Sequence, residues 1–363
     1  MIGRTAALFL VLLTCLTAQD KVKNIIILIG DGMGLNAVSL EFLKDQNSPY
    51  YSFPFTGLSV TTSADKLITD SAAGATAIST GTKTKNGYVG VGLSGTRLKT
   101  VFEYADDAGK STGLAVTSTI THATPGAFFG HVSDRGKQDV LAVDLLNSSV
   151  DVAIGSGSSY FIPASAGGRR TDNRNIISEL RAKGYYITST YADLVSTEVN
   201  DKLVAFLDSV ELPSAKERGF SLGDLTGMAI HKLNTNKNGF VLMVEGSQID
   251  WYAHDNDTVK IFQEMEDFTS AVRRALEFAK KDGRTLVIVT ADHETGGLAV
   301  NKGNFTDPAY TLRYTTKSHT AGAVPVFAFG PGSSNFTGLY HNDELGKRII
   351  RLIKTEKLKI KNY

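Results

Sequence analysis

Three long apolar runs are the most regular pattern in this chain. Residues 24–29, 240–244 and 285–290 are almost continuously hydrophobic, which is typical of strands buried on both faces of a parallel sheet. Each run leads into a polar or glycine-rich turn that carries a carboxylate; the three are Asp31, Glu245 and Asp292. Because the carboxyl ends of parallel strands lie at the same edge of a sheet, we expect these carboxylates to lie together.

The segments between these runs follow helical or short extended patterns. Apolar spacings of three and four, with turn residues at the ends, predict helices over 98–108, 141–146, 173–184, 259–281 and 343–354. Short strands are expected at 114–116, 203–206 and, after Pro325, at 326–329, whereas the glycine- and serine-rich stretch 154–171 is expected to be a flexible surface loop. The predicted fold is an α/β protein of three layers, with a largely parallel central sheet and helices on both faces.

The segment 67–77 contains a polar pair followed by a run of small residues. Asp70 and Ser71 end a lead-in with β-branched residues and alanines follow, so a helix is expected to begin near Ala72 with Ser71 at its N-terminus. The free N–H groups and partial positive charge of a helix start suit an anion. Ser71 is therefore either an ordinary N-cap or, if another group removes its proton, a nucleophile toward phosphate.

Four of the seven histidines lie in patterns that suit metal or phosphate binding. Asp250 and His254 are four residues apart, so a helix would present both on one face, where they could bind one Zn²⁺. Asp292 and His293 form a second such pair at a strand end, and the remaining two histidines of this kind lie in polar loops, at His122 and His319. The other three histidines, His131, His231 and His341, are expected to be structural or to lie at the surface.

An arginine in the segment 131–135 could bind phosphate. Arg135 could direct a bidentate guanidinium at two phosphate oxygens, although an isolated arginine is usually a surface charge. Two metals about 4 Å apart can hold the attacking and leaving oxygens of an in-line displacement and lower the pKa of a serine hydroxyl. A metal centre would therefore supply the activation that Ser71 needs.

The composition suits one large α/β domain. The chain has 363 residues, 42% of them hydrophobic, which allows a sizeable core. The formal net charge of +1 gives no bulk attraction to nucleic acid or to an anionic membrane. No nucleic acid is expected as a sequence-specific partner, and any phosphate site must be local.

The first 18 residues are typical of a signal peptide. Arg4 supplies the positive charge, residues 6–13 are apolar, and residues 16–18 offer a cleavage site; the apolar run is too short to span a bilayer. The only cysteine, Cys15, lies in this segment, so cleavage would leave no disulfide. Acylation at Cys15 as a lipoprotein is the alternative. We expect a periplasmic or secreted protein in which residues 19–363 form a single catalytic domain.

Taken together, these motifs resemble the alkaline phosphatase family. The matching segments occur in the family's order and are residues 29–34, 69–77, 123–125, 131–135, 244–246, 249–254, 290–297 and 318–320. The match is weak between residues 144 and 237, where no ligand motif is found. The resemblance implies an alkaline-phosphatase-like fold, a homodimer, and a phosphate-monoester hydrolase with two Zn²⁺ and one Mg²⁺ that is active at alkaline pH.

The resemblance also implies roles for the matched residues. Ser71 would attack phosphorus and form a phosphoserine, while Arg135 would hold the non-bridging oxygens. The implied ligands are Asp250, His254 and His319 for the first zinc; Asp31, Asp292 and His293 for the second, which Ser71 also reaches; and Asp31, Thr124 and Glu245 for magnesium.

Two positions depart from the best-known bacterial pattern of the family. His122 stands where that pattern has an aspartate, and Trp251 where it has a lysine; both look like a variant of the family. The change at His122 leaves open how firmly the third metal is held and whether it is always Mg²⁺. The missing cation at Trp251 predicts easier release of phosphate, although simple packing of the indole is the alternative.

Two other functions remain to be weighed. Related phosphodiesterases tend to carry a threonine nucleophile, and sulfatases a modified residue in a motif with proline and arginine; the residues 72–74 that follow Ser71 disfavour both. A secreted phosphate- or metal-binding protein without turnover would not need a serine beside the metals.

Overall fold

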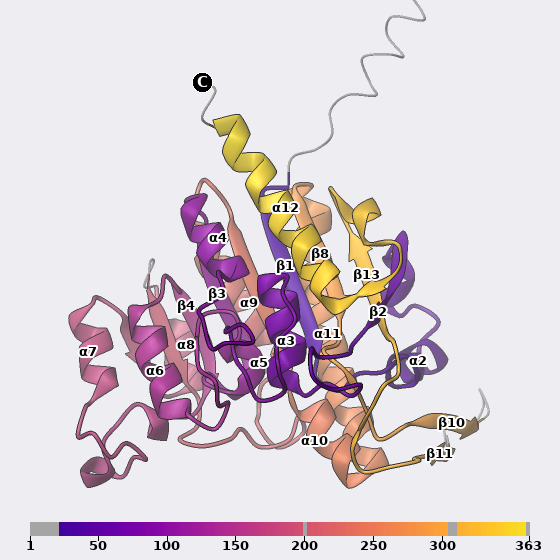
Figure 1. Ribbon diagram of the computed structural model, residues 1–363, viewed down its shortest axis with the longest axis horizontal. Helices are drawn as coiled ribbons and strands as arrows, with labels where there is room; N and C mark the ends of the chain where they lie inside the picture. The colour runs from indigo at the N-terminus through magenta and orange to yellow at the C-terminus, as the bar shows by residue number, and fades with distance from the viewer. Residues whose placement is uncertain (1–21, 199–201, 304–310, 361–363) are drawn as a thin grey trace, which may run out of the picture.

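The computed structural model describes residues 22–198, 202–303 and 311–360 (Figure 1). The predicted signal peptide and Cys15 lie outside these residues. Within them, no helix is both long enough and apolar enough to cross a membrane.

A ten-stranded sheet runs through the middle of the described chain, in the order β14-β2-β13-β8-β1-β7-β3-β4-β6-β5 (Figure 1). Strand β13 is antiparallel to both of its neighbours, and the other paired strands of this sheet are parallel. The strands are β1 (Asn24–Gly30), β2 (Phe55–Val60), β3 (Ser111–Thr119), β4 (Val152–Ser156), β5 (Tyr186–Thr188), β6 (Leu203–Phe206), β7 (Phe240–Gly246), β8 (Thr285–Thr290), β13 (Val324–Phe329) and β14 (Gly338–His341). Two small antiparallel pairs are β9 (Glu294–Thr295) with β12 (His319–Thr320), and β10 (Ala299–Lys302) with β11 (Thr311–Arg313).

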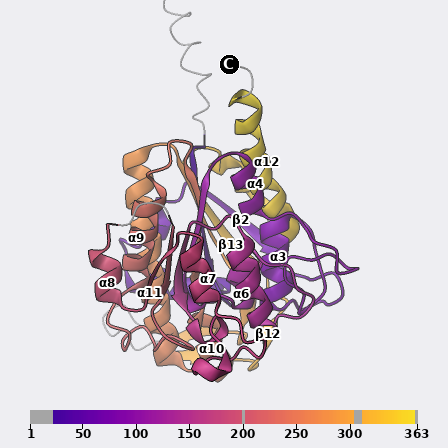
Figure 2. The ribbon, with the colours of Figure 1, turned by 90° about the vertical axis from the view of Figure 1, so that its left-hand side faces the viewer.

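Helices cover both faces of the sheet, which confirms the predicted three layers (Figure 2). One face carries α2 (Leu35–Lys44), α8 (Tyr191–Ser196), α9 (Leu222–Leu233) and α11 (Thr258–Asp282). The other carries α3 (Ser71–Thr80), α4 (Val101–Asp107), α6 (Gln138–Asn147), α7 (Ile176–Ala182) and α12 (Asn342–Ile360). The remaining short helices are α5 (Ala123–Gly126) and α10 (Gln248–Asp255), with 3₁₀ turns at η1 (Pro49–Ser52), η2 (Ser158–Tyr160), η3 (Ala164–Ala166) and η4 (Ser333–Phe336).

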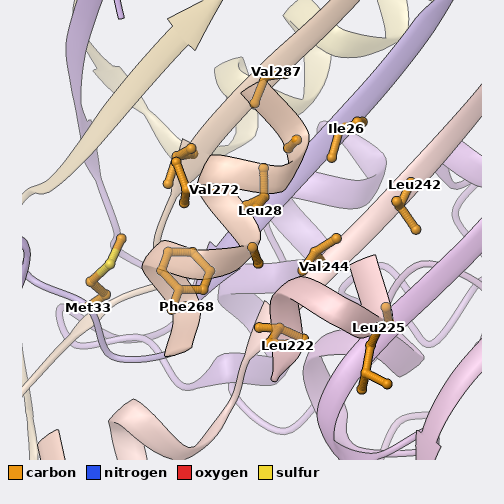
Figure 3. Packing of buried hydrophobic residues seen from close by; sticks show 14 of the residues in the cluster. Ile26, Leu28, Met33, Leu222, Leu225, Leu242, Val244, Phe268, Val272 and Val287 are labelled. Atoms are coloured by element: carbon orange, nitrogen blue, oxygen red, sulfur yellow. The ribbon is translucent and has the colours of Figure 1, made fainter. Parts of the chain in front are cut away.

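Strands β1, β7 and β8 are mostly apolar because both of their faces are buried. In β1, Ile26 and Leu28 pack in the same cluster as Phe268 of α11, as Figure 3 shows. The alternating residues Ile25 and Ile27 belong to the cluster on the opposite face. Each fully buried aliphatic side chain contributes about 1.5–3 kcal/mol, so continuous burial makes these strands the rigid part of the fold.

The stretch 154–171 differs from the predicted flexible loop. Its first residues belong to β4, and Phe161 is fully buried against Phe206, with ring centroids 4.6 Å apart. Arg170 is also buried, and its guanidinium donates to the backbone carbonyls of Asp139 and Tyr160. The prediction was wrong for these buried residues, whereas residues 164–167 and 169 are exposed as expected. Glycine and serine content describes local conformational freedom, but the burial of Phe161 and Arg170 also depends on Phe206 and Asp139, which lie outside the segment.

Two strand boundaries also differ from the prediction. β3 runs from Ser111 to Thr119 and is longer than the expected 114–116, because its threonines and serines are buried between neighbouring strands. Pro325 lies inside β13 and not before it. Proline is tolerated there because its fixed φ is compatible with an extended backbone and only one N–H is lost.

Candidate active site

The three turn carboxylates lie together at one edge of the sheet, as the sequence predicts. Strands β7 and β8 flank β1 in parallel register, with Ile29 opposite both Glu245 and Thr290. Asp31, Glu245 and Asp292 are all fully buried. Helix α10, which follows β7, lies beyond this edge, at the opposite end of the molecule from the last turns of α12 (Figure 1).

Ser71, at the start of helix α3, lies at this edge. The structure corrects the predicted N-terminus of this helix. The N-cap is Asp70, whose Oδ1 accepts the Ala73 N–H at 3.0 Å, and Ser71 is the first helical residue. Gly74 allows the close approach of the helix, because a Cβ there would lie 2.9 Å from the Asp292 carbonyl oxygen. Ser71 Oγ consequently lies 3.2 Å from His293 Nε2.

A first group of possible metal ligands comprises Asp250, His254 and His319. The first two lie on one face of α10, with His254 Nε2 3.4 Å from Asp250 Oδ2. His319, on β12, brings its Nε2 within 3.1 Å of His254 Nε2 and 3.6 Å of Asp250 Oδ1. One carboxylate and two imidazoles that converge in this way match the donors that Zn²⁺ accepts.

Two further groups overlap at Asp31. In the second group, His293 Nε2 lies 3.4 Å from Asp31 Oδ1 and 3.3 Å from Asp292 Oδ2. The third group joins Asp31 to His122 and Glu245. One carboxylate shared by two groups can bridge two cations.

The site contains buried polar atoms that lack a hydrogen-bond partner among the described residues. They are both carboxylate oxygens of Asp31, Glu245 Oε1, Asp292 Oδ2, Thr124 Oγ1 and His122 Nδ1. An unsatisfied buried polar atom costs about 1–3 kcal/mol, and a bound cation would remove that cost. The mixed nitrogen and oxygen donors of the first two groups suit Zn²⁺. The third group has the same donor types as the second, but the Thr124 hydroxyl beside Glu245 adds an oxygen donor of the kind that Mg²⁺ prefers.

The ring orientations of two histidines favour metal binding through Nε2. His254 Nδ1 lies 2.6 Å from the Lys317 carbonyl oxygen, and His319 Nδ1 lies 2.9 Å from that of Thr69. A carbonyl can only accept a hydrogen bond, so each Nδ1 carries the proton. Each Nε2 then keeps a lone pair directed at the first group.

The carboxylates of the three groups place several negative charges close together. Burial, reinforced by neighbouring carboxylates, raises the pKa of Asp292 to about 6 and that of Glu245 to about 8, and it raises the pKa of Asp31 well above its usual range. Burial also opposes ionisation of Asp250, but its contacts with His254 and His293 bring its pKa below the usual range. Such a cluster is stabilised when cations neutralise it.

The residues expected to contact phosphate also lie together. Asp70 Oδ2 accepts from Arg135 Nη1 at 3.2 Å and from the Gly87 N–H at 2.9 Å. Arg135 Nη2 lies 3.4 Å from His122 Nε2, and the His122 ring meets Trp251 edge to face at 6.1 Å. Asp70 therefore both caps α3 and orients the guanidinium beside Ser71.

The remaining histidines agree with their expected structural or surface positions. The His131 side chain is buried, with Nδ1 2.7 Å from the Gly90 carbonyl oxygen, while His231 and His341 are exposed. Thr295 was not among the residues expected at the site, although its hydroxyl contacts both Asp250 and His293. The sequence feature that could have identified Thr295 is its position two residues after His293.

A serine at a helix N-terminus lies beside overlapping groups of carboxylates and imidazoles, at the carboxyl edge of a mostly parallel sheet. This arrangement is typical of a metal-dependent hydrolase. The sequence comparisons agree with this class. The family model described as alkaline phosphatase matches residues 22–312, and the chain belongs to the alkaline phosphatase family.

Individual relatives give the same result. Alkaline phosphatase 3 of Bacillus subtilis is 35% identical over 93% of this chain and 90% of its own length, and alkaline phosphatase of Escherichia coli is 32% identical over 90% and 85%. The solved alkaline phosphatase from the Antarctic bacterium TAB5 superposes with a TM-score of 0.85 at 38% identity, covering 92% of this chain and 98% of that one. The predicted fold class and enzyme class are thereby confirmed.

Proposed function

We propose that this alkaline phosphatase hydrolyses phosphate monoesters through a phosphoserine at Ser71, at a site that holds two Zn²⁺ and one Mg²⁺. The observation that carries the proposal is the 3.2 Å separation of Ser71 Oγ from His293 Nε2, inside the second group of possible metal ligands. When bound, the metals would lower the pKa of hydroxyl groups and neutralise charge on the phosphoryl oxygens.

The chain's own residues bind and orient the substrate. Arg135, held by Asp70, donates to two non-bridging phosphoryl oxygens, and the free N–H groups at the start of α3 favour the same anion. Ser71 Oγ attacks phosphorus as the bond from phosphorus to the alcohol oxygen breaks. Water then cleaves the phosphoserine ester, which regenerates Ser71 and releases inorganic phosphate.

Each group of possible ligands corresponds to one metal in this proposal. Asp250, His254 and His319 would hold the first Zn²⁺, and Asp31, Asp292 and His293 the second. Asp31, Glu245 and Thr124 would hold Mg²⁺, with His122 beside it. A histidine-to-aspartate variant of the TAB5 enzyme is described with Mg bound in its M3 site, so a related site accepts Mg when an aspartate is introduced.

A comparison of three substrates tests the reaction. We expect turnover of an aryl phosphate monoester to exceed that of the matching diester and sulfate ester, because Arg135 and the helix N-terminus suit a dianionic terminal phosphoryl group. Preference for the diester would favour a phosphodiesterase, and preference for the sulfate a sulfatase. Zinc binding without turnover of any of them would favour a binding protein.

Trp251→Lys is expected to strengthen inhibition by inorganic phosphate. A lysine in place of the half-buried Trp251, beside His122, would add a cation near the bound anion, and a charge-assisted hydrogen bond contributes about 1.5–3 kcal/mol. The inhibition constant should fall at least about tenfold, measured by competition with an aryl phosphate. Trp251→Gln, which removes the indole without adding charge, is the control; unchanged inhibition by phosphate in Trp251→Lys would show that this position does not govern release.

We further propose export as a periplasmic or secreted homodimer with one catalytic domain over residues 19–363. Leu58 on β2 and Leu339 on the neighbouring edge strand β14 are paired in register, and both are exposed, at 40% and 68%, which supports association through an apolar surface at this end of the sheet. Light scattering gives the mass of the assembly. N-terminal sequencing of the exported protein distinguishes cleavage after Ala18 from acylation at Cys15.

A further inference from the structure

Thr295 contacts ligands of two different metal groups. Its Oγ1 lies 2.5 Å from Asp250 Oδ1, in the first group, and 3.2 Å from His293 Nδ1, in the second. The side chain is 2% exposed, so solvent does not compete for its hydroxyl. One hydroxyl therefore connects the two groups.

The chemistry of the three partners sets the direction of both hydrogen bonds. A carboxylate accepts only, so the single hydroxyl proton of Thr295 is donated to Asp250 Oδ1. The hydroxyl lone pair then faces His293 Nδ1, which must carry a proton and donate it. This tautomer leaves the His293 Nε2 lone pair facing Asp31, Asp292 and Ser71.

The backbone around Thr295 holds the hydroxyl in place. The Thr295 N–H donates to the Gly32 carbonyl oxygen at 3.1 Å, and Thr295 pairs with His319 across β9 and β12. Gly32 has a φ of +67°, and a Cβ there would lie 2.8 Å from both Asp250 Oδ1 and Thr295 Oγ1. The turn that carries Asp31 thus closes directly over this hydrogen bond.

We propose that Thr295 is a positioning residue that sets the metal affinity of both zinc groups through its hydroxyl. It orients the Asp250 carboxylate in one group and selects the metal-binding tautomer of His293 in the other. His254 and His319 rely on backbone carbonyls for the same purpose, so a side-chain substitution can remove the partner only at His293. This inference rests on the proposed metal centre.

Zinc affinity of the purified full-length protein tests the proposal. Thr295→Val keeps the shape and loses the hydroxyl, and Thr295→Ser keeps the hydroxyl. Equilibrium dialysis of the chelated proteins against buffered free zinc should show both sites weakened by about 10–100-fold in Thr295→Val, the usual effect of losing an outer hydrogen-bond partner of a ligand. Thr295→Ser should bind within a few-fold of the unmodified protein.

A matched control separates this effect from the general cost of a buried threonine-to-valine change. Thr226 is fully buried on α9, where its hydroxyl donates to the Leu222 carbonyl oxygen. Thr226→Val should leave both zinc affinities unchanged.

A second readout does not depend on metal. Nitrogen NMR of the zinc-free protein should show His293 protonated at Nδ1 in the unmodified protein and in Thr295→Ser, and a mixture of tautomers in Thr295→Val. Unchanged zinc affinity and tautomer in Thr295→Val would overturn the inference, as would equal losses in the valine and serine variants. Failure of the unmodified protein to bind zinc would instead contradict the proposed function.

Discussion

Ser71→Ala is expected to remove nearly all phosphomonoesterase activity while zinc and magnesium remain bound. The change deletes only the atom that forms the bond to phosphorus, and it leaves the aspartate, glutamate and histidine side chains of all three groups in place. Removal of a hydrolase's nucleophile costs from about a thousandfold to about a millionfold in kcat. The metals and Arg135 would still bind the substrate, so a small residual rate is consistent with the proposal.

Three measurements examine this variant together. Turnover of an aryl phosphate gives the rate, elemental analysis gives the metal content, and acid quenching with labelled substrate shows whether a phosphoprotein accumulates. Ser79→Ala is the matched control, because Ser79 lies on the same helix and donates to the Ala127 carbonyl oxygen away from the site. Full hydrolysis by Ser71→Ala would exclude the serine as nucleophile.

Removal of the metals is expected to abolish turnover and to destabilise the fold, with the loss of stability growing as the pH rises. The folded-state pKa values of Asp31, Asp292 and Glu245 are raised, the last two to about 6 and about 8. A group of this kind stabilises the fold below its unfolded pKa and loses that contribution as the pH rises through its folded pKa. Burial lowers the pKa of His122 to about 3 and that of His293 to about 4, and these shifts act in the opposite direction below about pH 6.5. The metal-free protein should therefore weaken between about pH 6.5 and pH 9.

The stabilisation that bound metal adds to the fold should grow over the same interval. Metal ligands bind in their deprotonated forms, so affinity rises with pH. At a free metal concentration 100 times the dissociation constant, binding adds about 2.7 kcal/mol to the free energy of unfolding. Denaturant unfolding with and without chelator, at several pH values, measures the difference.

Restoration of zinc and magnesium after chelation is the control for irreversible damage. Turnover and stability should return together when both metals are added back. A difference in stability that narrows from pH 6 to pH 9, or turnover that survives complete chelation, would contradict the assignment of the carboxylate cluster to metals.

The cap of α3 illustrates where sequence reasoning reaches its limit. Aspartate and serine are both strong N-cap residues, and they are adjacent here, so local preference cannot choose between Asp70 and Ser71. The choice depends on Gly87 and Arg135, which both donate to the second oxygen of Asp70. These partners lie 17 and 65 residues away along the chain.

Features that depend on neighbouring residues could be predicted from the sequence. Continuous apolar runs identified β1, β7 and β8, because strands buried on both faces of a parallel sheet are mostly hydrophobic. The spacing of Asp250 and His254 placed both on one face of α10, because helical periodicity repeats within four residues. The motif match to the alkaline phosphatase family selected the remaining candidates, and the comparisons confirmed that family.

Contacts between side chains that are distant in the chain could not be predicted and became visible in the folded structure. Ser71 and His293 are 222 residues apart in the chain, and His319 lies 250 residues from the carbonyl oxygen of Thr69 that its Nδ1 faces. The sharing of Asp31 between two groups and the link through Thr295 likewise depend on the packing of separate turns. Local preferences act over a few residues, whereas these contacts form only after the strand order of the sheet brings the turns to one edge.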